Sequence, residues 1–129
     1  MAREVYTQRM TFSRYDDKRC LVYLAEEEIP QYVPKDAPEG TKPVKGYAYT
    51  GPEVDGGTLI DAADVSRDTL INGIIRSKYS QTEEDAIKTH QIELLKDKNL
   101  PKASEYEAEW LTFCGIREMA KTYVDRWLA

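Results

Sequence analysis

The change from strand to helix that sets the fold class falls within residues 55–75, which read DGGTLIDAADVSRDTLINGII. Asp55-Gly56-Gly57 is a strong turn signal, and the short apolar run at residues 58–60 predicts a strand. Either Asp64 or Ser66 can cap a helix start. Beyond them the apolar residues take up helical spacing, in the stripe Leu70, Ile71, Ile74 and Ile75. We therefore expect a β-rich half at residues 1–60 and a helical half at residues 61–129.

Three segments before residue 55 have the composition of strands. Residues 4–15 alternate apolar and polar side chains, and residues 20–25 are nearly all apolar, which predicts a central strand. The two should form an antiparallel hairpin across the polar cluster at residues 16–19. Residues 44–50 predict a third strand, with Tyr47 and Tyr49 on one face. Residues 26–43 are predicted to be a loop, because they contain Pro30, Pro34, Pro38 and Pro43.

Two capping-box patterns divide the rest of the helical half. Ser80 with Glu83 predicts a helix that starts at about residue 81 and ends before Pro101, with the apolar face Ala86, Ile87, Leu94 and Leu95. Ser104 with Glu107 predicts the longest helix, which runs nearly to Ala129. The fold class is therefore predicted to be α+β. We expect one domain, residues 1–129, in which a small antiparallel sheet of three to four strands packs against about three helices.

The composition bears on the class of partner and on the compartment. The chain of 129 residues has a formal net charge of −5, from 23 acidic and 18 basic residues, which argues against nucleic acid as a partner. No apolar stretch approaches the roughly 20 residues of a membrane helix, and the N-terminus lacks the apolar core of a signal peptide. Cys20 and Cys114 are expected to be free thiols in a reducing compartment. We expect a cytoplasmic or virion-associated protein.

No pattern in the sequence points to catalysis. His90 is the only histidine, and no serine or cysteine lies in a nucleophile motif. The carboxylates Asp55, Asp61, Asp64 and Asp68 do not have the spacing of a calcium loop. We therefore predict that the protein is not an enzyme and has no catalytic residues, no cofactor and no metal site. One alternative stays open, a small-ligand-binding protein or enzyme with its site in the Asp55–Asp68 segment.

The aromatic residues are most simply part of the core, and they also suggest a protein-binding surface. The longest predicted helix carries Trp110, Tyr123 and Trp127 on one broad face, and large aromatic side chains dominate the binding energy of protein interfaces. With Tyr47 and Tyr49 they form the candidate interface, for a second copy of the chain or another protein. The leading hypothesis is a non-enzymatic interaction protein, and homo-oligomerisation is one form it can take. A second alternative is a regulatory protein that binds a host protein through an acidic surface.

Part of the chain resembles a known group of proteins. Residues 47–60 read YAYTGPEVDGGTLI and residues 70–80 read LINGIIRSKYS, before an acidic helix and a closing helix that ends VDRWLA. Together these segments resemble small uncharacterised proteins of gut Bacteroidetes and of the phages or prophages they carry, often encoded near virion structural genes. The resemblance implies a virion structural or assembly-accessory role and identifies no catalytic residue.

Overall fold

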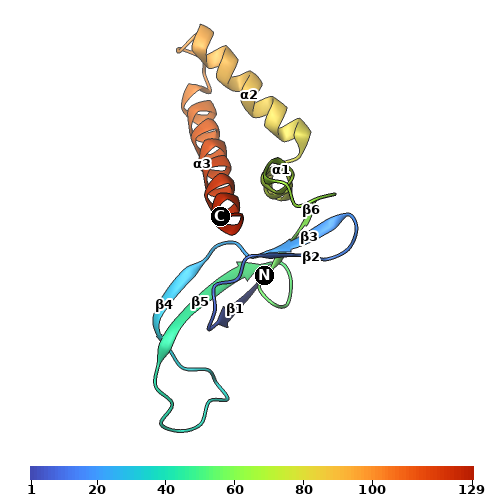
Figure 1. Cartoon of the computed structure of the whole chain (residues 1–129). Coiled ribbons are helices and arrows are strands. Elements are labelled where there is room, and N and C mark those ends of the chain that lie inside the picture. Colours follow the sequence, from blue (N-terminus) through green and yellow to red (C-terminus); the bar gives the residue numbers. More distant parts are fainter. The chain divides into compact units, whose positions relative to one another are not determined.

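The computed structural model describes residues 1–129 and divides the chain into two compact units. Met1–Ile60 is here called the β-rich unit and Asp61–Ala129 the helical unit. The boundary lies within residues 55–75, where the sequence changes from strand to helix. Six strands precede three helices (Figure 1), which confirms the predicted α+β class. That the two units form one domain, with helices packed against a sheet, stays a prediction.

The first of two sheets in the chain is built from β1 (Ala2–Tyr6), β5 (Val44–Gly51) and β4 (Glu27–Tyr32), in the order β1-β5-β4. Both pairings are antiparallel, so Tyr47 of β5 lies opposite Tyr6 on one side and Glu28 on the other. β5 is therefore a central strand. Both edges of β5 are paired with strands of this chain, so Tyr47 and Tyr49 do not lie on an edge strand that another chain could join.

The second sheet contains β2 (Phe12–Arg14), β3 (Arg19–Val22) and β6 (Thr58–Asp61), in the order β2-β3-β6. β2 and β3 form the predicted antiparallel hairpin, with Phe12 opposite Val22. The Asp16 carboxylate closes its turn by accepting hydrogen bonds from the backbone N–H groups of Lys18 and Arg19. β3 is the central strand, as predicted, although it ends at Val22 and the chain bends at Ala25, whose φ is 54°.

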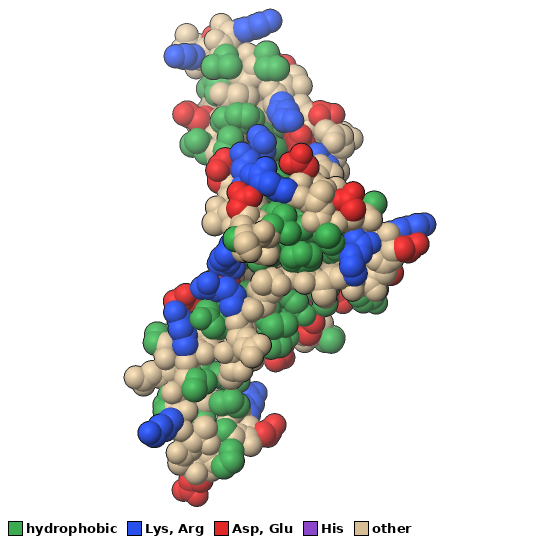
Figure 2. Space-filling model, viewed as in Figure 1, with side chains coloured by type: hydrophobic (Ala, Val, Ile, Leu, Met, Phe, Trp, Pro, Cys, Tyr) green, Lys and Arg blue, Asp and Glu red, His purple; other side chains and the backbone are tan.

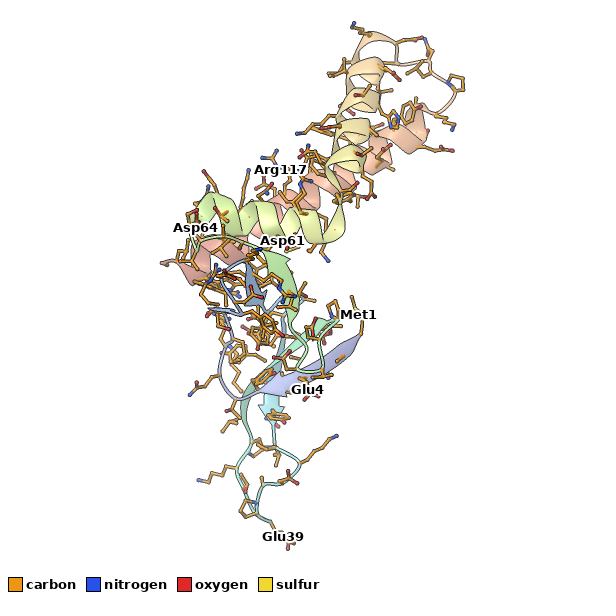
Figure 3. The ribbon with its side chains drawn as sticks, turned by 90° about the vertical axis from the view of Figure 1, so that its right-hand side faces the viewer. Met1, Glu4, Glu39, Asp61, Asp64 and Arg117 are labelled. Carbon is orange, nitrogen blue, oxygen red and sulfur yellow. The ribbon has the colours of Figure 1, made fainter.

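Two predictions about the β-rich unit were wrong. Residues 4–15 do not form one strand, because the chain leaves the first sheet after Tyr6, and the Met10 N–H donates to the Tyr49 hydroxyl instead of a strand partner. The predicted loop also contains β4, so there are two sheets of three strands where one sheet of three to four was expected. Pro30 is tolerated because β4 is an edge strand whose register shifts between Ile29 and Tyr32. Glu39 lies in the remaining loop, which extends away from the sheet (Figure 3).

The predicted turn at Asp55-Gly56-Gly57 is confirmed. The Gly56 N–H donates to the Glu53 carbonyl oxygen, and Asp55 Oδ1 accepts from the Gly57 N–H at 3.0 Å. Gly56 has a φ of +82°, and a Cβ at this position would lie 2.6 Å from the Tyr49 carbonyl oxygen. Only glycine fits both the backbone conformation and the close approach.

The helical unit consists of α1 (Arg67–Lys78), α2 (Gln81–Lys96) and α3 (Ala103–Trp127). α1 begins after Ser66, whose hydroxyl accepts from the Thr69 N–H, so Ser66 and not Asp64 is the N-cap. The stripe predicted for this helix is buried, and Leu70 and Ile74 have no exposed surface. None of the three helices combines the length and apolar character needed to cross a membrane.

Only one of the two predicted capping boxes forms. Ser80 and Glu83 make both reciprocal hydrogen bonds at the start of α2. At α3 the N-cap is Lys102, which provides no side-chain hydrogen bond, and Ser104 already lies within the helix. The reason is the preceding turn, in which the Ala103 N–H donates to the Leu100 carbonyl oxygen and starts the helix two residues earlier than the box predicts.

Replacing Ser80 with alanine is expected to lower the free energy of unfolding by about 1 kcal/mol, within a range of about 0.5–2 kcal/mol. Ser104→Ala is the matched control and should change it by less than about 0.5 kcal/mol, since no cap is lost. Urea denaturation followed by circular dichroism measures both. Equal losses from the two variants would contradict the assignment of the caps.

Candidate interaction surface

α2 leaves most of its apolar face uncovered. Only Glu84 and Ile87 are buried in this 16-residue helix. Of the apolar face predicted for it, Ala86 is exposed, Leu94 is half-buried and Leu95 keeps 69% of its surface in water. Of the four residues of this predicted apolar face, only Ile87 is buried. α2 packs against α3, and one neighbouring helix covers only a narrow stripe of another helix's surface.

A groove runs between the end of α2 and the start of α3, with a volume of about 480 Å³. Both walls repeat at helical spacing. The wall from the α2 side consists of Gln91, then Leu94 and Leu95, then Lys98, so its members follow one another about one helical turn apart. Lys98 lies just beyond the end of α2. α3 contributes Ala103, Ser104, Glu107, Trp110 and Leu111. We call this groove, together with Ile92 three residues before Leu95, the hairpin surface.

Three large aliphatic side chains of the hairpin surface are mostly in water. Ile92 is 56% exposed, Leu95 69% and Leu111 63%. Figure 2 shows hydrophobic side chains gathered on the surface near the α2–α3 turn, beside basic side chains. A single exposed leucine is ordinary in a folded protein, but a group of them around a groove with a polar rim is typical of a binding surface.

The two charged residues that line the groove have no ion-pair partner within the chain. Lys98 lies at the turn end, and Glu107 lies one helical turn into α3. Neither takes part in any of the ion pairs of the structure. The groove therefore offers an apolar lining with one free positive and one free negative group.

His90 joins α2 to α3 beside this surface. Its ring is stacked on Tyr106, with centroids 4.1 Å apart and an angle of 11° between the planes, and its Nδ1 lies 3.1 Å from Glu109 Oε1. The sequence did not suggest these partners, because Glu109 is 19 positions away on another helix. Glu109 also lines a second hollow of about 460 Å³, with Tyr79, Ala86 and Thr112 among its walls. A histidine–carboxylate pair without an adjacent nucleophile serves here as an interhelix contact.

Glu84 ties α1 to α2. Its carboxylate accepts from Arg76 at 2.8 Å and from Lys88 at 2.5 Å. Burial acts to raise the pKa of Glu84, but the hydrogen bonds and charges of the two cations outweigh it and lower that pKa below its usual value. All three residues line a hollow of about 250 Å³ to which α3 adds Arg117, labelled in Figure 3.

The β-rich unit contains a cluster of three tyrosine rings, Tyr6, Tyr23 and Tyr49, with centroids 5.6–6.2 Å apart. Tyr23 donates to the Asp55 carboxylate at 2.7 Å, and Tyr49 donates to Glu26 Oε1 at 2.7 Å. Burial, and next the hydrogen bond to Asp55, raise the pKa of Tyr23 far above its usual value. The Tyr23 phenol therefore stays neutral and acts as a hydrogen-bond donor to Asp55.

The structure separates the five residues predicted as a candidate interface. Tyr49 is fully buried, so its predicted role as an exposed contact is wrong. Tyr47, Trp110, Tyr123 and Trp127 are half-buried. Trp110 lines the hairpin surface, whereas Trp127 lies 17 residues further along α3, about 26 Å away at 1.5 Å per residue. The two tryptophans therefore do not belong to one small contact patch.

The acids of the Asp55–Asp68 segment have separate local contacts. Asp55 belongs to the β-rich unit and accepts hydrogen bonds from Tyr23 and Gly57, while Asp64 accepts from the Ser66 N–H. Asp61 and Asp64 lie before α1 (Figure 3), and Asp68 is paired with Arg67 at 3.7 Å. No group of three or more His, Cys, Asp or Glu side chains is arranged to hold a metal ion. Cys20 and Cys114 are both free thiols.

Comparison with known protein families, with curated proteins and with solved structures gives no match to this chain.

Proposed function

We propose that this chain is a non-enzymatic interaction protein that binds another protein chain through the hairpin surface. The observation that carries the proposal is the group Ile92, Leu95 and Leu111, each more than half exposed. Leu95 and Leu111 line the groove of about 480 Å³, and Ile92 lies three residues before Leu95 on α2. Fully burying one such side chain contributes about 1.5–3 kcal/mol. A partner that covers all three gains several kcal/mol and leaves the charged rim in water, which is the usual anatomy of a protein interface.

The titratable groups that the fold brings together support a non-enzymatic role. Glu84 is bonded to two cations, and Asp55 is bonded to Tyr23 and to the backbone of its own turn. His90 is stacked and paired between two helices. Each group has an evident structural task, and the hydrogen-bond partners of their side chains are not serine or cysteine hydroxyl or thiol groups.

A phage-like particle is the setting that we propose for this contact, as a structural or assembly-accessory component. The support is the resemblance of residues 47–60 and 70–80. An assembling particle needs proteins that bind their neighbours through exposed apolar surface, which the hairpin surface offers.

Site-specific photo-crosslinking in the source cell tests the function. A photoreactive amino acid placed at residue 95 or 111 is expected to give covalent adducts with a protein chain, because these side chains lie inside the contact. Placed at Val54, which is 89% exposed in the β-rich unit, it should give few. Mass spectrometry of the adducts identifies the partner, and analysis of purified particles tests the proposed setting.

Equal and low yields at residues 54, 95 and 111 would contradict the proposed function. Adducts at residue 54 alone would place the contact on the β-rich unit instead.

A further inference from the structure

The hairpin surface carries both a recess and the side chains that could fill one. Leu95 and Leu111 line the groove and also project from it, with 69% and 63% of their surfaces exposed. In a contact with two-fold symmetry the same patch of each copy meets itself, so the patch must supply both the projecting group and the hollow. This surface meets that requirement.

The charges of the groove also suit contact with a second copy, because the groove carries one positive and one negative side chain. Lys98 and Glu107 are separated along the hairpin by about one helical turn, and neither is paired within the chain. A two-fold axis that passes between them reverses one hairpin relative to the other. Lys98 of each copy then faces Glu107 of its partner, and both otherwise unpaired charges gain a partner of opposite sign.

Building on the proposed function, we propose that the partner at the hairpin surface is a second copy of this chain. The two hairpins lie antiparallel about a two-fold axis, with Leu95 of each copy against the groove of the other and a Lys98–Glu107 pair on each side of the axis. The groove has nine lining residues per copy, fewer than the roughly 20–30 of a standard interface, so the dimer is expected to be weak.

The first test measures the mass of the purified chain by analytical ultracentrifugation from about 1 μM to 1 mM. The wild-type chain is expected to pass from monomer to dimer over this range. Leu95→Asp should weaken the dimer at least about tenfold, because it places a charge in the apolar contact. Val54→Asp is the matched control, since it makes the same kind of change on the β-rich unit, and it should leave the mass unchanged.

The second test exchanges the two charges. Lys98→Glu and Glu107→Lys should each weaken the homodimer about tenfold, because each brings like charges together twice. A mixture of the two single variants should form a heterodimer, and the double variant should regain the homodimer, since both restore opposite charges on both sides of the axis. These effects should shrink in high salt, which screens the pairs. Circular dichroism checks that every variant is folded.

The outcomes separate this inference from the function on which it rests. A wild-type chain that stays monomeric to 1 mM, while residue 95 crosslinks a different protein in the cell, overturns the second copy and leaves the interaction function standing. A dimer that neither the leucine nor the charge variants weaken overturns the two-fold contact at this surface. A monomer without crosslinks in the cell overturns both proposals.

Discussion

Tyr49→Ala is expected to lower the free energy of unfolding by about 3–5 kcal/mol, the usual loss for truncating a buried aromatic side chain. Tyr49 has no exposed surface, and its ring contacts Tyr6 and Tyr23. Its hydroxyl accepts from the Met10 N–H at 2.9 Å and donates to Glu26 at 2.7 Å. Urea denaturation followed by far-ultraviolet circular dichroism measures the change.

Two further variants separate the ring of Tyr49 from its hydroxyl. Tyr49→Phe keeps the ring and should lose about 1–3 kcal/mol, because a buried N–H and a carboxylate each lose a partner. Tyr47→Ala removes a half-buried ring from the same strand and should cost less than half as much as Tyr49→Ala. A loss below about 1 kcal/mol for Tyr49→Ala would show that the ring is not in the interior.

Phe113→Ala should lower the free energy of unfolding by a similar amount, about 3–5 kcal/mol. Phe113 is fully buried in the helical unit, where its ring meets Tyr79 edge-on at 5.3 Å and lies 6.1 Å from Trp110. Leu111→Ala, two residues earlier, is the matched control. Leu111 is 63% exposed, so its truncation should cost less than about 1 kcal/mol in the monomer.

Thermal denaturation of the same variants at low protein concentration checks the order of the two losses. If Leu111→Ala proves as destabilising as Phe113→Ala, Leu111 belongs to the core and the hairpin surface loses one of its three apolar side chains. The Tyr49 and Phe113 variants also test the predicted single domain. One domain requires both to shift a common transition, whereas independent units give two transitions, of which each variant shifts one.

The sequence correctly predicted those elements that depend on residues close together in the chain. Ser80 and Glu83 lie three residues apart and cap α2 by bonding each other's backbone. The stripe from Leu70 to Ile75 repeats at helical spacing, so one face of α1 had to be apolar and is buried. Gly56 stands where the turn requires a positive φ. In each case the residues that decide the structure are within a few positions of one another.

Predictions failed where a distant contact, the position of a strand in its sheet or a competing helix start decides the structure. Met10 bonds Tyr49, 39 positions away, and the strand predicted for residues 4–15 therefore breaks in two. Pro30 enters a strand because β4 has a neighbour on one side only. Ser104 lies inside α3 because the turn from Leu100 starts the helix earlier. Neither sheet position nor the competition between two helix starts can be read from local composition.

The sequence by itself determined the α+β class, the strand-to-helix boundary near residue 60, the cap of α2 and the buried stripe of α1, because these follow from the spacing of near neighbours. Only the tertiary structure decided which apolar side chains stay in water. Leu95 and Ile87 both belong to the predicted apolar face of α2, but Ile87 is buried and Leu95 is 69% exposed. The hairpin surface exists because one helix covers only part of another.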